Sequence, residues 1–264
     1  MLILYIILVL LIAQLIVLGY WASYGPLKFL GIKHMEKLPG NAKNYNMDTV
    51  EPLQNSPLAG KHVCFLGSSV TYGSASLQQG IPEYFAARMG CTYTKEAVSG
   101  TTLVDNGKSS YVQRLIHNVD VNAHYDLLIC QLSTNDASRK LPLGMIADSK
   151  NPENFDTHTI TGAIEYIICY AQKTWACPVV FYTGSYYDSA EYDAMVQRLL
   201  SLQEKWGVGI LNLWSNEAFN QISAELRMLY MNDKIHPTKA GYKLWWCPEM
   251  ERQLLALLKT NLDD

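Results

Sequence analysis

From Lys61 onward, apolar strand-like runs alternate with segments of helical periodicity, and this alternation restricts the possible folds most strongly. The strands are expected at 62–66, 92–97, 127–132, 179–183 and 208–213. The helices are expected at 79–89, 111–119, 159–174, 190–206, 217–230 and from Thr238 to about Lys259. Parallel strands need crossover connections, which helices usually provide. The pattern therefore predicts an α/β fold of three layers, α/β/α, with a five-stranded, mainly parallel sheet.

The first part of the chain is expected to lie outside this domain. The run from Leu2 to Leu18 is uncharged and almost entirely apolar, which predicts a transmembrane anchor over residues 1–23. Two alternatives are a cleaved signal peptide, disfavoured because no Lys or Arg precedes the run, and a core helix, disfavoured because the run has no polar face. Residues 24–60 are rich in Gly, Pro and Asn and are expected to form a linker or surface arm. The folded domain is then expected to occupy residues 61–264.

The side of the membrane on which this domain lies is left open. Lysines at 28, 33, 37 and 43 follow the apolar run, and the positive-inside rule would keep the domain cytoplasmic.

The chain has 6 cysteines without paired metal-ligand spacing, mostly in apolar runs, so we expect buried free thiols. The net charge is −3 and the Lys and Arg residues are scattered, which argues against a nucleic-acid partner.

A candidate nucleophile follows the first expected strand, in the run FLGSSVTYG at 65–73. The strand leads directly into Gly67, Ser68 and Ser69, so a hydroxyl is placed at a tight turn beside the carboxyl end of a strand, where working residues of parallel sheets gather. From position alone, either serine is a candidate. An ordinary Gly-Ser turn is the alternative, and a serine hydroxyl needs a base to become an effective nucleophile.

A candidate base stands near the other end of the chain, in the run DKIHPTKAGY at 233–242. Asp233 precedes His236 by three residues, close enough within a turn to accept a hydrogen bond from Nδ1 and direct Nε2 toward a serine. The alternative is an aspartate that only stabilises a turn beside a surface histidine.

Two loops that follow the second and third expected strands offer hydrogen-bond donors. The first, at 98–102, contains Gly100, and the second, at 133–136, contains Asn135. Parallel strands would bring both loops to the edge of the sheet that also carries Ser69. A backbone amide and a side-chain amide at this edge are suitable donors for an oxyanion, although each loop taken singly is ordinary.

Taken together, these four runs resemble the conserved blocks of the SGNH hydrolases, also called the GDSL esterase/lipase family. The resemblance covers residues 61–264, and its DKIHPTKAGY run is especially characteristic. It implies a flavodoxin-like SGNH hydrolase fold and assigns the nucleophile to Ser69. The chain departs from the family pattern at two positions, because Ser68 stands in place of the usual aspartate and Ser133 in place of the usual glycine. The second departure questions the loop geometry, since serine is less free in φ than glycine.

The resemblance also implies roles for individual residues. Ser69, His236 and Asp233 would form a catalytic triad, and the oxyanion hole would comprise the Ser69 and Gly100 amides with the Asn135 side chain. No metal or organic cofactor would be required. The implied activity is that of a serine esterase.

The substrate is expected to be a small-molecule or carbohydrate ester, with short acyl or O-acetyl groups. The tyrosine-rich stretch at 182–188 is either part of the substrate site, where it would stack on a sugar, or a surface loop. Two other functions remain open: an acyltransferase that uses the same triad, and a non-catalytic binding protein that retains the fold.

Overall fold

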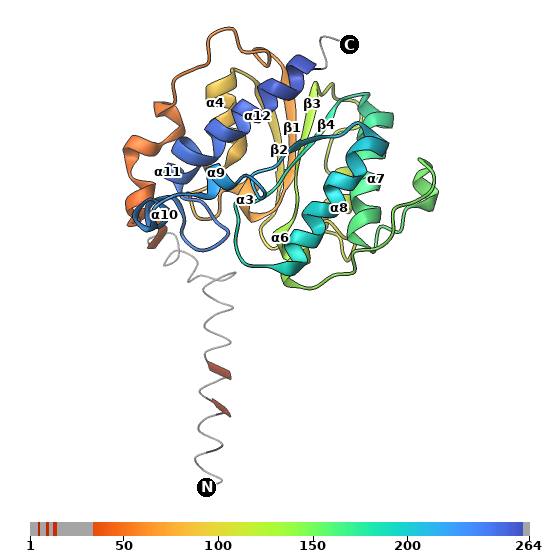
Figure 1. The fold of residues 1–264 in the computed structure, drawn as a ribbon, viewed down its shortest axis with the longest axis horizontal. Helices are drawn as coiled ribbons and strands as arrows, with labels where there is room; N and C mark the ends of the chain where they lie inside the picture. Colours follow the sequence, from red (N-terminus) through yellow and green to blue (C-terminus); the bar gives the residue numbers. More distant parts are fainter. Residues whose placement is uncertain (1–4, 6–8, 11–12, 15–33, 261–264) are drawn as a thin grey trace.

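The computed structural model describes residues 5, 9–10, 13–14 and 34–260 (Figure 1). The predicted transmembrane anchor at residues 1–23 falls mostly outside these residues. Within the described part of the chain, no helix is both long enough and apolar enough to cross a membrane.

The centre of the molecule is a five-stranded sheet in which every neighbouring pair of strands is parallel. Its strands are β1 (His62–Gly67), β2 (Thr92–Ala97), β3 (Leu127–Gln131), β4 (Val179–Tyr182) and β5 (Gly209–Leu211). Their order, β2-β1-β3-β4-β5, is that of the flavodoxin-like folds. The predicted sheet and its position in the sequence are therefore confirmed.

Helices cover both faces of the sheet and complete the predicted three layers (Figure 1). The longer helices are α4 (Ile81–Met89), α5 (Tyr111–His117), α7 (Ile160–Trp175), α8 (Ala190–Trp206) and α12 (Cys247–Thr260). One apolar core packs α5, α7 and α8 against the sheet, and a second packs α4 and α12 against the opposite face. Strands buried on both faces are continuously apolar, which explains why β1, β3 and β4 were recognisable in the sequence.

Two predicted helices differ in the structure. The helix expected at 217–230 is divided into α9 (Glu217–Asn220) and α10 (Ala224–Tyr230). The division has a local cause, since Ser223 caps α10 by accepting a hydrogen bond from the Leu226 amide. The C-terminal helix begins as α11 (Lys239–Gly241), continues through a π-helical segment η5 (Tyr242–Trp246) and ends as α12.

The described part of the predicted arm packs against the domain. Its 3₁₀ turns are η1 (Pro39–Asn41), η2 (Lys43–Tyr45) and η3 (Met47–Thr49); a further turn, η4 (Pro152–Asn154), precedes α7. The buried Asn41 side chain donates to the Ala75 carbonyl at 2.8 Å and accepts from the Lys239 amide at 3.0 Å. These bonds join η1 to the loop that contains Ala75 and to the start of α11. The boundary at Lys61 stays a prediction.

The 6 cysteines are all free and all buried, as expected. Their thiols lie within the apolar core, where burial raises the pKa of Cys91 and of Cys177 to about 11. At that pKa, a thiol is protonated at neutral pH and is a poor nucleophile.

Candidate active site

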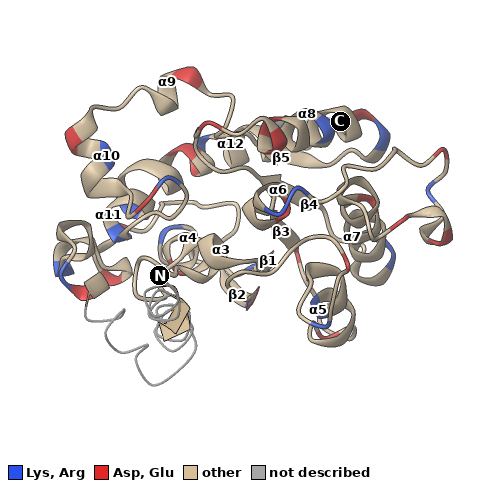
Figure 2. Ribbon diagram, turned by 90° about the horizontal axis from the view of Figure 1, so that it is seen from below, with Lys and Arg blue, Asp and Glu red and all other residues tan. Residues whose placement is uncertain are grey.

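The site lies at the edge of the sheet where the parallel strands end. Figure 2 looks onto this edge and shows the short helices α3 (Ser69–Tyr72) and α6 (Thr134–Ser138) at the ends of β1 and β3. These two strands are hydrogen-bonded neighbours, so their following turns lie side by side. Both turns were predicted from the sequence, but the two helices were not, because they are only 4 and 5 residues long.

A chain of hydrogen bonds joins Ser69, His236 and Asp233. The distance from Ser69 Oγ to His236 Nε2 is 2.8 Å, and His236 Nδ1 lies 2.8 Å from Asp233 Oδ2 and 3.0 Å from Oδ1. An ionised carboxylate only accepts hydrogen bonds, so Nδ1 carries a proton and Nε2 of the neutral ring is left to accept from the serine hydroxyl. The structure thus brings together three residues that were predicted from runs more than 160 positions apart.

The surroundings of Asp233 keep its carboxyl group ionised. Burial acts to raise the pKa of Asp233, but the hydrogen bond from the His236 ring, the favourable electrostatic interaction with that ring, and the amides of Ile235 and His236 outweigh it. These amides donate to Asp233 Oδ1 at 2.8 and 2.9 Å. The pKa of Asp233 is therefore well below its usual range, and the carboxylate holds the imidazole orientation throughout the neutral pH range.

The neighbouring serines have different environments. Ser69 contacts His236, whereas the Ser68 side chain is fully buried and accepts a hydrogen bond from Asn135 Nδ2 at 3.3 Å. Ser68 is the N-cap position of α3, and no hydrogen bond joins its hydroxyl to His236. Of the two candidates, only Ser69 is within reach of the base.

Gln131 holds the turn that carries Ser69, a role that sequence analysis missed. Its Oε1 accepts from the Ser68 amide at 3.0 Å, from the Thr71 amide at 3.2 Å and from Thr71 Oγ1 at 2.9 Å. Thr71 Oγ1 also lies 2.6 Å from the hydroxyl of Tyr182 at the end of β4. A glutamine ending an otherwise apolar, fully buried strand was the available signal, because a buried amide needs partners.

The predicted oxyanion donors surround the same turn. Within the described part of the chain, the backbone amides of Ser69 and Gly100 donate to no protein atom. Gly100 has φ of 80°, a conformation that favours glycine, and its carbonyl accepts from Arg139 at 2.7 Å. Asn135 Nδ2 donates to the Thr101 carbonyl at 2.9 Å in addition to its longer bond to Ser68. Two unused backbone amides therefore lie beside Ser69, and Asn135 can donate to an oxyanion by exchanging its longer bond to Ser68.

Serine at position 133 fits the loop that precedes Asn135. Ser133 has φ of −73° and ψ of 124°, so no left-handed conformation is required there. Its hydroxyl accepts from the Asn135 amide at 3.2 Å and caps α6. Serine can therefore replace the usual glycine at position 133 without straining the backbone of this loop.

Two buried charged residues brace the loops and were not predicted. Asp136 accepts from the amides of Leu103 at 2.8 Å and Val104 at 3.0 Å, which ties the Gly100 loop to α6. Burial raises the pKa of Asp136, while these amides act in the opposite direction. Arg114 on α5 is 2% exposed and donates to the Gly67 carbonyl at 2.8 Å and to Thr101 Oγ1 at 3.1 Å.

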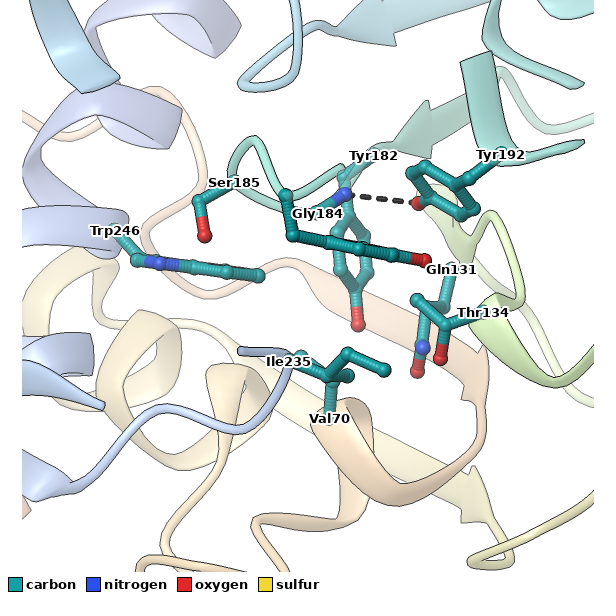
Figure 3. Close-up of a pocket in the computed structure, with 10 residues that line it drawn as sticks. Val70, Gln131, Thr134, Tyr182, Gly184, Ser185, Tyr192, Ile235 and Trp246 are labelled. Carbon is teal, nitrogen blue, oxygen red and sulfur yellow. Dashed lines mark hydrogen bonds between the residues drawn. The ribbon is translucent and has the colours of Figure 1, made fainter. Parts of the chain in front are cut away.

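A small cavity lies next to these residues (Figure 3). Val70, Thr134 and Ile235 line it, and each directly follows or precedes Ser69, Asn135 or His236 in the chain. The rest of the wall includes Trp246 and residues of the 182–188 stretch, namely Tyr182, Gly184, Ser185 and Tyr187. The tyrosine-rich stretch is therefore part of this region. The cavity has a volume of about 10 Å³, close to the space that one water molecule needs.

In the residues that the structure describes, no group of three or more His, Cys, Asp or Glu side chains is arranged to hold a metal ion. The groups brought together at the strand ends are a serine, an imidazole, a carboxylate and amide donors, which are suited to acyl transfer through a covalent intermediate.

Comparison with protein families gives a match to the GDSL-like Lipase/Acylhydrolase family over residues 65–244. The matched segment begins in β1 and ends beyond His236, so it includes every predicted site residue. No curated protein matches the sequence at a significant level.

Several solved structures share the fold. A protein from Lactobacillus plantarum is 20% identical, with 76% of this chain and 98% of that chain covered, at a TM-score of 0.60. A protein described as a GDSL-like lipase, from Bacteroides uniformis ATCC 8492, is 15% identical, with 76% of this chain and 96% of that chain covered, at a TM-score of 0.54. A family two carbohydrate esterase from Clostridium thermocellum, in complex with cellohexaose, is 16% identical, with 81% of this chain and 66% of that chain covered, at a TM-score of 0.53. At these identities the similarity demonstrates a common fold.

Proposed function

The chain belongs to the GDSL-like lipase/acylhydrolase family and is a hydrolase acting on ester bonds, and we propose that Ser69, His236 and Asp233 are its catalytic triad. The observation that carries this proposal is the continuous hydrogen-bond chain from the Ser69 hydroxyl through the imidazole to the Asp233 carboxylate. This arrangement supplies a nucleophile, a base and a group that orients the base.

In the first half-reaction, Ser69 Oγ attacks the carbonyl carbon of the ester while its proton passes to His236 Nε2. The amides of Ser69 and Gly100 and the side chain of Asn135 stabilise the negative charge that develops on the carbonyl oxygen. His236 then donates the proton to the leaving alkoxide, and the acyl group remains on Ser69. In the second half-reaction, the neutral imidazole takes a proton from the water that attacks the acyl-enzyme, and His236 then returns this proton to Ser69 Oγ as the acid is released.

We further propose that the acyl group is short, as in an acetyl ester. Support comes from the cavity beside the triad, whose volume is about 10 Å³ and whose walls include the apolar side chains of Val70, Ile235 and Trp246. A methyl group is only slightly larger than the single water molecule for which this cavity has room, whereas a long acyl chain would require these side chains to move, with the packing cost that such changes carry.

Hydrolysis of p-nitrophenyl esters of increasing acyl length tests this proposal. We expect kcat/KM to be highest for acetate and at least roughly tenfold lower for octanoate, a difference of about 1.4 kcal/mol in transition-state stabilisation. Equal or greater activity on octanoate would contradict the short-acyl assignment. Transfer of the acetyl group to an added acceptor sugar in preference to water would favour the acyltransferase, and an absence of turnover would favour a binding protein.

The oxyanion role of Asn135 predicts a selective loss of turnover. In Asn135→Ala, we expect kcat to fall on the order of 10²–10³-fold with KM nearly unchanged, because the lost hydrogen bond is strongest in the transition state. Steady-state kinetics on p-nitrophenyl acetate measure both quantities. The matched control is Ser138→Ala on the same helix, whose exposed hydroxyl donates only to the Asn135 carbonyl. A similarly small decrease in kcat for both variants would show that Asn135 does not contribute to the oxyanion hole.

Membrane attachment is a separate proposal, supported only by the uncharged run from Leu2 to Leu18. Alkaline extraction of membranes from cells that produce the full chain tests it, because an anchored protein stays in the pellet. Recovery of the full-length chain in the supernatant would contradict the anchor. Protease accessibility in intact cells then shows on which side of the membrane the domain lies.

A further inference from the structure

A second and larger hollow lies beside the active-site edge, between the loops that follow β4 and β5. It is a groove of about 460 Å³, lined by Tyr186, Asp193, Trp214, Glu217, Asn220 and Gln221. The loops end neighbouring strands of the sheet, so the groove belongs to the same edge that carries Ser69. The triad does not use any of these residues.

The groove contains an exposed aromatic ring that is held in place from behind. Tyr186 is 51% exposed, and its ring centroid lies 5.0 Å from that of the buried Trp214. Trp214 is fixed in turn by the rings of Tyr187 and Tyr192, at 5.1 and 4.8 Å, and by a 2.9 Å hydrogen bond from its indole to Asp193. A rigid aromatic face open to solvent offers a flat apolar surface at little entropic cost to binding.

The loop that carries Tyr186 is equally well fixed. The Tyr186 amide donates to Asn220 Oδ1 at 2.8 Å, and Asn220 Nδ2 donates to the carbonyls of Leu213 at 2.8 Å and Trp214 at 3.2 Å. Asn220 therefore joins the loop after β4 to the loop after β5. The groove is formed before a ligand arrives, as binding sites for small molecules usually are.

The remaining lining selects for a neutral, hydroxyl-rich ligand. Asp193 and Glu217 provide carboxylate acceptors, Gln221 provides an amide, and no Lys or Arg is among the groove's lining residues. A sugar ring has an apolar face of C–H groups that can lie on Tyr186, and hydroxyl groups around its rim that can donate to carboxylates. A glycan rich in carboxylates or phosphates would be repelled by the same acidic groups.

The groove and the small cavity are joined through one loop. Ser185 and Tyr187, on either side of Tyr186 in the chain, both line the cavity next to Val70 and Ile235. We propose that the groove binds the sugar chain of an acylated neutral oligosaccharide whose ester group is cleaved at Ser69. This inference rests on the proposed esterase function and adds the class of alcohol from which the acyl group is removed.

The test compares partially acetylated xylo-, cello- and manno-oligosaccharides, from disaccharide to hexasaccharide, with p-nitrophenyl acetate, which is too small to span both sites. For wild type we expect kcat/KM per ester to rise with chain length in at least one series. In Tyr186→Ala we expect a loss of roughly tenfold or more on the hexasaccharide of that series, with activity on p-nitrophenyl acetate within about twofold of wild type. Tyr186→Phe keeps the ring and should retain most of the activity.

The matched control is Met145→Ala, which removes an apolar side chain that is 84% exposed and lies outside the groove. Met145→Ala should leave kcat/KM unchanged for both the oligosaccharides and p-nitrophenyl acetate. If p-nitrophenyl acetate is hydrolysed but no series shows a dependence on chain length, or if Tyr186→Ala lowers activity on both substrates equally, the groove is not a glycan site. If no ester of either kind is hydrolysed, the proposed esterase function fails, and this inference fails with it.

Discussion

Replacing Ser69 with alanine is expected to lower kcat for p-nitrophenyl acetate on the order of 10⁴–10⁶-fold. The reason is that Ser69 Oγ is the only side-chain hydroxyl bonded to His236 Nε2 among the described residues. The substitution should leave the fold intact, because the carbonyl of residue 69 still accepts the hydrogen bonds from the amides of Gly73 and Ser74 at 3.0 Å. Steady-state kinetics, with circular dichroism as a check on folding, measure both expectations.

Ser68→Ala is the matched control for this experiment. Ser68 is the adjacent serine, but it is fully buried and its hydroxyl contacts Asn135 at 3.3 Å and not the imidazole. Losing this long hydrogen bond should cost about tenfold in kcat or less, since a typical net hydrogen bond contributes about 1 kcal/mol. If Ser68→Ala abolished activity and Ser69→Ala did not, the nucleophile assigned to the triad would be wrong.

The second large effect is expected for Arg114, whose five N–H groups are all used within the protein. Its guanidinium donates to the carbonyls of Ser109, Glu96 and Gly67 at 2.8–2.9 Å, to the Glu96 carboxylate at 3.0 Å and to Thr101 Oγ1 at 3.1 Å. Arg114→Met should lower the free energy of unfolding by about 3–5 kcal/mol, because it removes the cation paired with the Glu96 carboxylate and all five hydrogen bonds of a side chain that is 2% exposed. Urea denaturation monitored by tryptophan fluorescence measures this change.

A matched control shows whether the loss of stability arises from the burial of Arg114 or only from the loss of a positive charge. Arg252 also forms an ion pair, with Glu249 at 2.6 Å, but its side chain is 66% exposed. Arg252→Met should therefore change the free energy of unfolding by less than about 1 kcal/mol. Arg114→Lys keeps a positive charge but loses the planar fork, so it should fall between wild type and Arg114→Met. Equal effects of Arg114→Met and Arg252→Met would contradict the role given to the buried guanidinium.

The sheet was predictable from sequence because its strands are apolar on both faces and helices separate them. The helix expected at 217–230 was wrong as one unit, because helical periodicity continues through residues 221–223 while Ser223 acts as a cap that begins a new helix. The π-helical turn at Tyr242–Trp246 was also missed, since residue pattern alone does not distinguish it from an α-helix.

Within the candidate site, the residues that stand in short characteristic runs could be located from the sequence, and the residues that support them could not. Ser69, Gly100, Asn135, Asp233 and His236 stand in short runs of recognisable composition, and the structure places them at one edge. Gln131 and Arg114, by contrast, act over distances of 47 to 63 positions along the chain. Their role depends on which loops the fold brings close, and this information appears only in three dimensions.

Whether Ser69 is the nucleophile activated by His236 can be tested by treating the protein with a fluorophosphonate and locating the adduct by mass spectrometry. Such probes react with a serine hydroxyl only when a base activates it. If Ser69 is the activated nucleophile, we expect a single adduct on Ser69, lost in Ser69→Ala and strongly reduced in His236→Ala. An adduct on Ser68, or no adduct on protein that hydrolyses p-nitrophenyl acetate, would contradict it.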